Sequence, residues 1–81
     1  MTTTNTIIRD LVAEHGNLGT DVSRLADTDD LYAHGLSSLA TVQLMLAIED
    51  SFEIELPERL LVRSTFESVA AIADAVALLQ T

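Results

Sequence analysis

The feature that most constrains the fold is an uninterrupted helical stretch in the middle of the chain, preceded by a loop and two serines. The fourteen residues from Leu39 to Phe52 contain neither proline nor glycine, and most of them permit a helix. Gly35 interrupts the preceding segment, and Ser37 can cap the helix by accepting a hydrogen bond from a free backbone N–H. Ser38 is therefore predicted at the positive end of a helix, where unpaired N–H groups and the helix dipole favour a phosphate.

Two faces of this predicted helix carry apolar residues when its positions are placed at about 100° steps. We expect one arc to be buried, and its members are Thr41, Leu44, Met45, Ile48 and Phe52. A second stripe begins beside Ser38 and mixes apolar with acidic residues: Leu39, Val42, Leu46, Glu49 and Glu53. A helix that only closes a core needs the first arc alone, so the second stripe predicts a docking surface for partner proteins. For the two glutamates, the alternative is an ordinary solvated helix face.

The length and the absence of cysteine restrict the kinds of chemistry this chain can perform. Eighty-one residues predict one domain over residues 1–81, which is too small for a core together with an enclosed substrate cavity. A self-contained enzyme is therefore not expected. The chain has no cysteine, so it has no disulfide, no zinc-thiolate site and no thiol nucleophile of its own. Any thioester chemistry would need a sulfur from another molecule.

The charge balance predicts which partners the chain can approach. The chain contains thirteen acidic residues and four arginines, and its formal net charge is -9. Such a chain repels nucleic acid and anionic membranes and is attracted to basic protein surfaces, so a basic enzyme is the expected partner. The N-terminal residues show no signal peptide, and no apolar run approaches the length of a membrane span. We therefore expect a cytoplasmic monomer.

Patterns on either side of the central stretch predict further helices. An amphipathic pattern predicts a helix near residues 5–15, with residues 1–4 frayed, His15 capping carbonyls at its end and Gly16 as its stop. Pro57 suits the first turn of a short helix near residues 58–62. Ser64 and Glu67 form a capping box, which predicts the start of a last helix near residues 66–79.

The connection of about twenty residues before Leu36 is long for so small a domain. Its acidic residues Asp27, Asp29 and Asp30 do not form an EF-hand loop, because Tyr32 and Ser38 stand where that loop needs Gly and Glu. No metal site is predicted. A helical turn is possible at residues 22–26, and apolar side chains can pin the connection across the helices: Leu18, Val22, Leu25, Leu31 and Leu36.

These elements together predict an all-α fold. We expect a small bundle of three main helices, near residues 5–15, 38–53 and 66–79, plus the short helix and a long ordered loop between the first two. The predicted core consists of Ile7, Leu11, Val12, Leu44, Met45, Ile48, Phe52, Leu56, Phe66, Val69, Ile72 and Val76.

The run GLSSLATVQLMLAIEDSFEIELP resembles the signature of the acyl carrier protein family, including its aminoacyl and peptidyl carrier relatives. In that family a Gly-x-x-Ser-Leu segment opens the second helix, and an acidic residue, an aromatic residue and an Ile/Leu-Pro pair follow at set distances. The matching residues are Gly35, Ser38, Leu39, Glu49, Phe52, Leu56 and Pro57. The residue before the matched serine is commonly Asp in bacterial fatty-acid carriers and is Ser37 here, which weakens an assignment to that pathway.

The resemblance implies a small helical bundle that can open to shelter an acyl chain, without catalytic residues of its own. It implies that Ser38 carries 4′-phosphopantetheine, transferred from coenzyme A by a phosphopantetheinyl transferase. The arm would hold acyl groups as thioesters and present them to loading ligases and acyl-transferring enzymes. Tethering keeps such a group at high effective concentration near a docked enzyme.

Three alternatives remain. Ser37 and Gln43, which replace familiar acidic residues, keep open a stand-alone aminoacyl or peptidyl carrier that an amino-acid-activating ligase loads. If the two serines are merely helix caps, the chain is an acidic helical adapter without a prosthetic group. A serine hydrolase built from Asp30, His34 and Ser38 is weak, because the segment lacks the second glycine of a nucleophile elbow and nothing marks an oxyanion hole.

Overall fold

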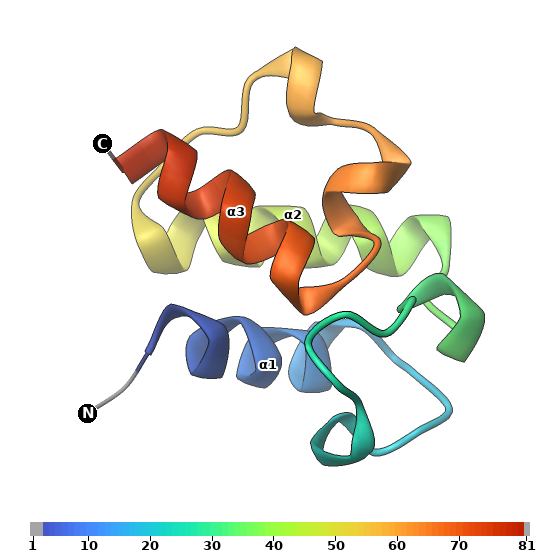
Figure 1. The fold of residues 1–81 in the computed structure, drawn as a ribbon. Coiled ribbons are helices and arrows are strands. Elements are labelled where there is room, and N and C mark those ends of the chain that lie inside the picture. Colours follow the sequence, from blue (N-terminus) through green and yellow to red (C-terminus); the bar gives the residue numbers. More distant parts are fainter. Residues whose placement is uncertain (1–2, 81) are drawn as a thin grey trace.

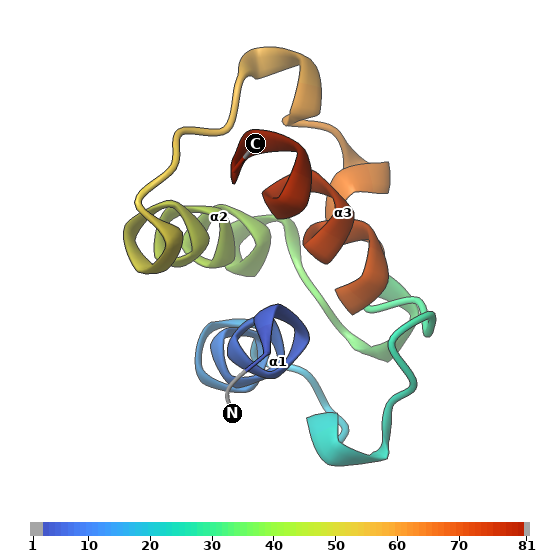
Figure 2. The same ribbon diagram turned by 60° about the vertical axis from the view of Figure 1, so that its left-hand side comes forward.

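Helix α1 (Thr4–His15) packs against both α2 (Ser38–Phe52) and α3 (Val69–Gln80), and the three helices enclose one apolar core (Figure 1). The computed structural model describes residues 3–80. Four short 3-10 helices within this range occupy the connections: η1 (Val22–Arg24), η2 (Tyr32–His34), η3 (Glu58–Leu60) and η4 (Arg63–Phe66). Figure 2 shows α1 and α2 one above the other, with α3 beside them. The predicted all-α bundle with a long loop between the first two helices is confirmed.

Local hydrogen bonds explain where α1 begins and ends. The Thr3 side chain caps the helix by accepting from the Thr6 N–H at 3.1 Å. Residues 1–4 were predicted to fray. Residues 1 and 2 lie outside the described range, whereas Thr3 is the N-cap and Thr4 is the first helical residue. At the other end, the Gly16 N–H donates to Val12 O at 2.8 Å, and a Cβ at Gly16 would lie 2.6 Å from that oxygen. Only glycine fits there.

Most of the predicted core is buried, and one residue of α1 was misplaced. Ile8 is fully buried, whereas its predicted neighbour Ile7 is half-buried and packs against the edge of the core. Met45 and Phe52 are also half-buried rather than central. The other nine predicted core residues are buried as expected: Leu11, Val12, Leu44, Ile48, Leu56, Phe66, Val69, Ile72 and Val76.

The long loop between α1 and α2 is held to the bundle by buried side chains and backbone hydrogen bonds. Leu31 is fully buried, and Val22, Leu25 and Leu36 are buried beside it, as the sequence predicted. The Leu31 N–H donates to Glu67 O at 2.7 Å, and Asp27 O accepts from the Ala70 N–H at 2.8 Å. The loop is therefore attached to the start of α3 as well as to α1.

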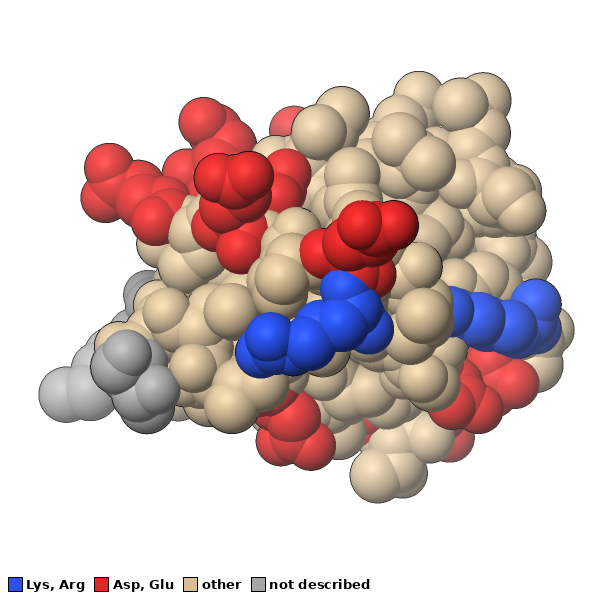
Figure 3. All heavy atoms as spheres, turned by 90° about the horizontal axis from the view of Figure 1, so that it is seen from above, with Lys and Arg blue, Asp and Glu red and all other residues tan. Residues whose placement is uncertain are grey.

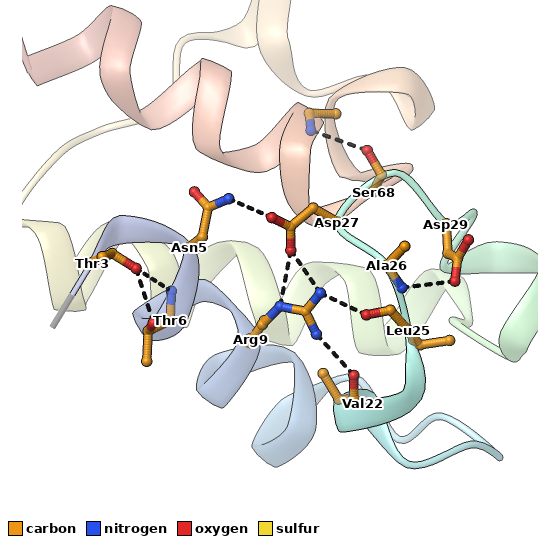
Figure 4. A network of polar contacts seen from close by, with 11 residues as sticks. Thr3, Asn5, Thr6, Arg9, Val22, Leu25, Ala26, Asp27, Asp29 and Ser68 are labelled. Carbon is orange, nitrogen blue, oxygen red and sulfur yellow. Dashed lines mark hydrogen bonds and ion pairs between the residues drawn. The ribbon is translucent and has the colours of Figure 1, made fainter.

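A polar cluster centred on Arg9 fixes the same loop to α1 (Figure 4). The guanidinium donates to Val22 O at 2.9 Å and to Leu25 O at 2.6 Å, and it forms an ion pair with the Asp27 carboxylate at 2.6 Å. The Asn5 side chain donates to the other carboxylate oxygen at 2.8 Å. Hydrogen bonds from Asn5 and Arg9 lower the pKa of Asp27. Asp27 thus contacts α1 through its side chain and α3 through its carbonyl oxygen, which accepts from the Ala70 N–H.

The capping box predicted at Ser64 and Glu67 is wrong. Residues Arg63–Phe66 form the 3-10 helix η4, and α3 begins only at Val69, where the Ser68 hydroxyl accepts from the Ala71 N–H at 3.0 Å. The local signal was overridden because the Ala70 N–H, which would close a helical turn on Phe66 O, donates to Asp27 O in the long loop instead. The predicted helix over residues 58–62 is likewise shorter, since η3 ends at Leu60.

Within residues 3–80, no helix combines the length and the apolar content that crossing a membrane requires.

Candidate functional site

Ser38 is the first residue of α2, and its exposed side chain stands where the helix begins. Ser37 caps the helix as predicted: its backbone is extended, at φ -87° and ψ 167°, and its Oγ accepts from the Ala40 N–H at 3.0 Å. The Thr41 N–H then donates to Ser37 O at 2.9 Å and closes the first turn. Because Ser37 performs the capping, the hydroxyl of Ser38 remains available for chemistry.

The backbone around Ser38 favours an anion. Within the described part of the chain, the N–H groups of Ser38 and Leu39 have no acceptor in the protein, since the cap and the first turn use those of Ala40 and Thr41. Two unpaired donors and the positive end of a fifteen-residue helix therefore lie at the serine. A phosphate ester on Ser38 fits this environment.

The segment before α2 fixes the position of the serine pair. Gly35 has φ 108°, in a region that favours glycine, and its N–H donates to Tyr32 O at 3.2 Å. Leu36 is buried, and its N–H donates to Leu31 O at 3.1 Å. One anchored residue thus separates the turn from Ser37, so the start of α2 has little freedom relative to the core.

A groove of about 290 Å³ opens beside Ser38. Its lining comes from η2, from the first two turns of α2 and from the segment after η3, and consists of Tyr32, Ser38, Thr41, Val42, Met45, Leu61, Val62, Arg63 and Phe66. Thr41 and Met45, which the sequence predicted in the buried arc of the helix, are half-buried because they form this lining. The buried row of α2 consists instead of Ala40, Leu44 and Ile48.

Two lining residues that the sequence did not single out are in contact across the groove. The Arg63 guanidinium carbon lies 3.9 Å from the centroid of the Tyr32 ring, within cation–π distance. The Tyr32 hydroxyl oxygen lies 3.4 Å from Thr41 Oγ1. No local sequence signal pairs Tyr32 with Arg63, because they are thirty-one positions apart and meet only when η2 and η4 fold against α2.

The apolar members of the predicted stripe are exposed on α2. Leu39 is 69% exposed, Val42 50% and Leu46 55%, which are high values for such side chains on a monomer. The acidic members differ from each other. Glu49 is half-buried, and its Oε2 accepts from the Leu56 N–H at 2.8 Å, whereas Glu53 is exposed and ends the helix in a left-handed conformation. Glu49 therefore has a structural partner that the sequence did not reveal.

The charged residues are unevenly distributed over the surface. On the face drawn in Figure 3, acidic side chains gather at the upper left, uncharged atoms cover the upper right, and the few basic side chains lie below both, across the middle of the view. With a net charge of -9, the chain offers a basic partner an attractive approach.

The residues of the serine-hydrolase alternative do not form a catalytic arrangement. His34 Nδ1 lies 3.4 Å from Thr20 Oγ1, and the Asp30 carboxylate accepts from the Tyr32 N–H at 2.9 Å. Within residues 3–80, no hydrogen bond connects Asp30, His34 and Ser38, and no group of three potential metal ligands is present. His15 lies 3.8 Å from the carboxylate of Glu14.

Comparison with known proteins identifies similar chains. Residues 7–76 match the family described as "Phosphopantetheine attachment site". An aminoacyl carrier protein of Agrobacterium fabrum (strain C58) is 53% identical over 75 residues, which is 93% of this chain and 90% of that protein.

Two solved structures contain chains that are similar to this one in sequence and in fold. One is an engineered Bradyrhizobium japonicum glycine:[carrier protein] ligase in complex with a carrier protein from Agrobacterium tumefaciens and ATP. The chain of that structure that matches is 52% identical, with a TM-score of 0.92, and the match covers 95% of this chain and all of that chain. The corresponding AMP complex gives 53% identity and a TM-score of 0.88 over 90% of this chain and 97% of that chain.

Proposed function

Because this chain belongs to the phosphopantetheine attachment-site family of carrier proteins, we propose that Ser38 carries the 4′-phosphopantetheine arm. The observation that carries this proposal is the exposed hydroxyl of Ser38 on the first residue of α2, beside two unpaired N–H groups. Ser37 supports it by capping the helix with its own hydroxyl. A separate transferase would take the arm from coenzyme A, since within residues 3–80 no hydrogen bond joins Asp30, His34 and Ser38 into a catalytic arrangement.

We further propose that the cargo is an amino acid. When attached, the arm supplies the thiol that this cysteine-free chain lacks and holds the cargo as a thioester. The aminoacyl carrier protein that matches most of the chain supports this cargo, as does the glycine:[carrier protein] ligase bound to a similar carrier. The presence of ATP in one ligase complex and AMP in the other fits activation by adenylation. Loading from ATP and coenzyme A also implies a cytoplasmic site of action.

The exposed stripe on α2 is the proposed docking surface for the ligase and the transferase. Leu39, Val42 and Leu46 would bury apolar area against the partner, and Glu53 would attract basic side chains at the far end of the helix. Glu49 can contribute through its Oε1, since Oε2 already accepts from the Leu56 N–H. Each exposed charge would act mainly on the association rate.

Intact-mass measurement tests the attachment site. The purified chain, incubated with coenzyme A, magnesium and a broad-specificity phosphopantetheinyl transferase, should gain the mass of one phosphopantetheinyl group. Ser38→Ala should gain nothing, and the matched variant Ser37→Ala should still gain one group. An unmodified wild-type chain, or equal modification of Ser38→Ala, would leave only the adapter alternative.

The cargo is tested on the modified protein. Incubation with ATP, a mixture of amino acids and a glycine:[carrier protein] ligase should add one aminoacyl group, which hydroxylamine removes. If only neutral acyl groups are added when acyl-activating ligases are supplied in parallel, the chain carries acyl rather than aminoacyl cargo.

Substitutions in the stripe test the docking surface. Leu46→Ala and Glu53→Lys should each lower kcat/KM for loading several-fold, while the far-UV spectrum and the Tm remain near those of wild type. Asp74→Lys is a matched control, because Asp74 is exposed on α3 away from the stripe. Loading rates equal to that of the control would identify the stripe as ordinary surface.

A further inference from the structure

The groove beside Ser38 has one wall on the same helix as the serine. Ser38, Thr41, Val42 and Met45 recur at intervals of three and four residues, so they share one face of α2. At a rise of 1.5 Å per residue, this wall is roughly 10 Å long. A flexible group attached to Ser38 therefore begins at one end of the groove and can follow it.

Most of the lining is apolar. Val42, Met45, Leu61, Val62 and Phe66 contribute hydrocarbon or thioether surface, and the hydroxyls come from Tyr32, Ser38 and Thr41. The groove can thus take neutral groups of mixed polarity. A cationic group that enters it loses hydration without gaining a counter-ion from these walls.

Arg63 is the one charged side chain among the nine described residues that line the groove. Its exposed guanidinium is held against the Tyr32 ring at 3.9 Å, which fixes the positive charge on the lining. The chain contains thirteen acidic residues, yet among the described residues no carboxylate lies within ion-pair distance of Arg63; the pairs found are Arg9–Asp27 and His15–Glu14. No ion pair among residues 3–80 therefore neutralises the charge of Arg63.

We propose that this groove selects the cargo by charge: it admits a neutral acyl group at the end of the arm, and Arg63 excludes the ammonium group of an aminoacyl cargo. An uncompensated guanidinium repels a second cation, and the apolar walls penalise its desolvation. An aminoacyl group therefore stays in solvent, accessible to a docked enzyme. This inference rests on the proposed attachment at Ser38.

A pair of cargoes with equal numbers of heavy atoms tests the charge selection. The glycyl group carries an ammonium group where the propionyl group carries a methyl group. Both can be linked through a stable amide to a coenzyme A analogue that the transferase accepts. Intact mass first verifies complete modification. NMR then measures the shift changes of the Val42 amide and the Met45 methyl group between the loaded and unloaded forms.

In the wild-type protein, the propionyl group should shift both signals, and the glycyl group should produce about a fifth of that change or less. Arg63→Gln should raise the glycyl change about fivefold, the factor that two unit charges about 4 Å apart give at the dielectric constant of water. Arg63→Lys keeps the charge and should leave the glycyl change small. Arg59→Gln is the matched control, because it removes an exposed arginine that does not line the groove.

Equal shifts for the two cargoes in the wild-type protein would overturn the inference, as would no shift for either. So would an Arg63→Gln protein that behaves like Arg59→Gln. A complete gain of mass at Ser38 combined with any of these results refutes charge selection while leaving the proposed function intact. A chain that gains no mass would refute attachment at Ser38, and the inference with it.

Discussion

Replacing Ser37 with alanine isolates the contribution of the N-cap to the helix that presents Ser38. The substitution removes one hydrogen bond, the 3.0 Å contact from the Ala40 N–H to Ser37 Oγ. Ser37 is exposed, so the change opens no cavity in the core. Its effect on the free energy of unfolding should therefore come from the cap alone.

The expected loss is about 1 kcal/mol, the usual cost of replacing a serine N-cap by alanine. For a domain of this size, that loss lowers the Tm by about 4 to 8 °C. Ser37→Asp should restore the Tm to the wild-type value or above it, because aspartate caps equally well and places a negative charge at the positive end of the helix.

Thermal unfolding followed by circular dichroism at 222 nm measures these differences, with urea unfolding as a second determination. Ser51→Ala is the matched control, since Ser51 is exposed inside α2 and alanine favours a helix interior. The reasoning is refuted if Ser37→Ala melts with the wild-type protein, or if Ser37→Asp loses as much stability as Ser37→Ala.

Four other substitutions test the surroundings of the site by thermal unfolding. Leu31→Ala should cost about 3 kcal/mol because the side chain is fully buried, whereas Leu39→Ala, at an exposed position, should change stability by less than about 0.5 kcal/mol. Gly35→Ala should cost about 1 to 2 kcal/mol, since φ is 108° there; no loss would contradict the strain argument. The lowered pKa of Asp27 means that its stabilisation is present above pH 3.8 and is lost as the pH falls through the folded-state pKa. Asp27→Asn should therefore lower the Tm at neutral pH and flatten its fall in acid, and parallel acid profiles would contradict this assignment.

Local signals in the sequence were sufficient for the part of the site that depends on one helix. The capping residue Ser37, the run without proline or glycine that follows it and the exposed stripe all lie within a single stretch. The start of α2 and the place of Ser38 on it could therefore be predicted. The loop was also predictable in outline, because its apolar side chains could pin it across the helices.

The same kind of signal failed before α3. Ser64 and Glu67 satisfy a capping box, but the hydrogen bonds from the Ala70 N–H to Asp27 O and from the Leu31 N–H to Glu67 O are tertiary interactions. They place the helix start at Val69, with Ser68 as the cap. In α1, periodicity likewise identified an apolar arc, but the predicted core contained Ile7 where the structure buries Ile8, because the centre of the buried arc depends on which residues of α2 and α3 lie opposite it.

The groove could not be predicted for a related reason. Helical periodicity predicts the side of α2 on which Thr41 and Met45 lie. It does not predict whether the segment after Pro57 fills the space beside that side of α2. That segment folds as two short 3-10 helices, η3 and η4, rather than as one α-helix, so it lays no continuous row of side chains against α2. Space is left where a longer helix would have packed, and Arg63 is brought over Tyr32 at its edge. The irregular backbone between Pro57 and Ser68 therefore accounts for three observations: the predicted helix near residues 58–62 is shorter, the predicted capping box at Ser64 and Glu67 is absent, and a groove opens beside Ser38.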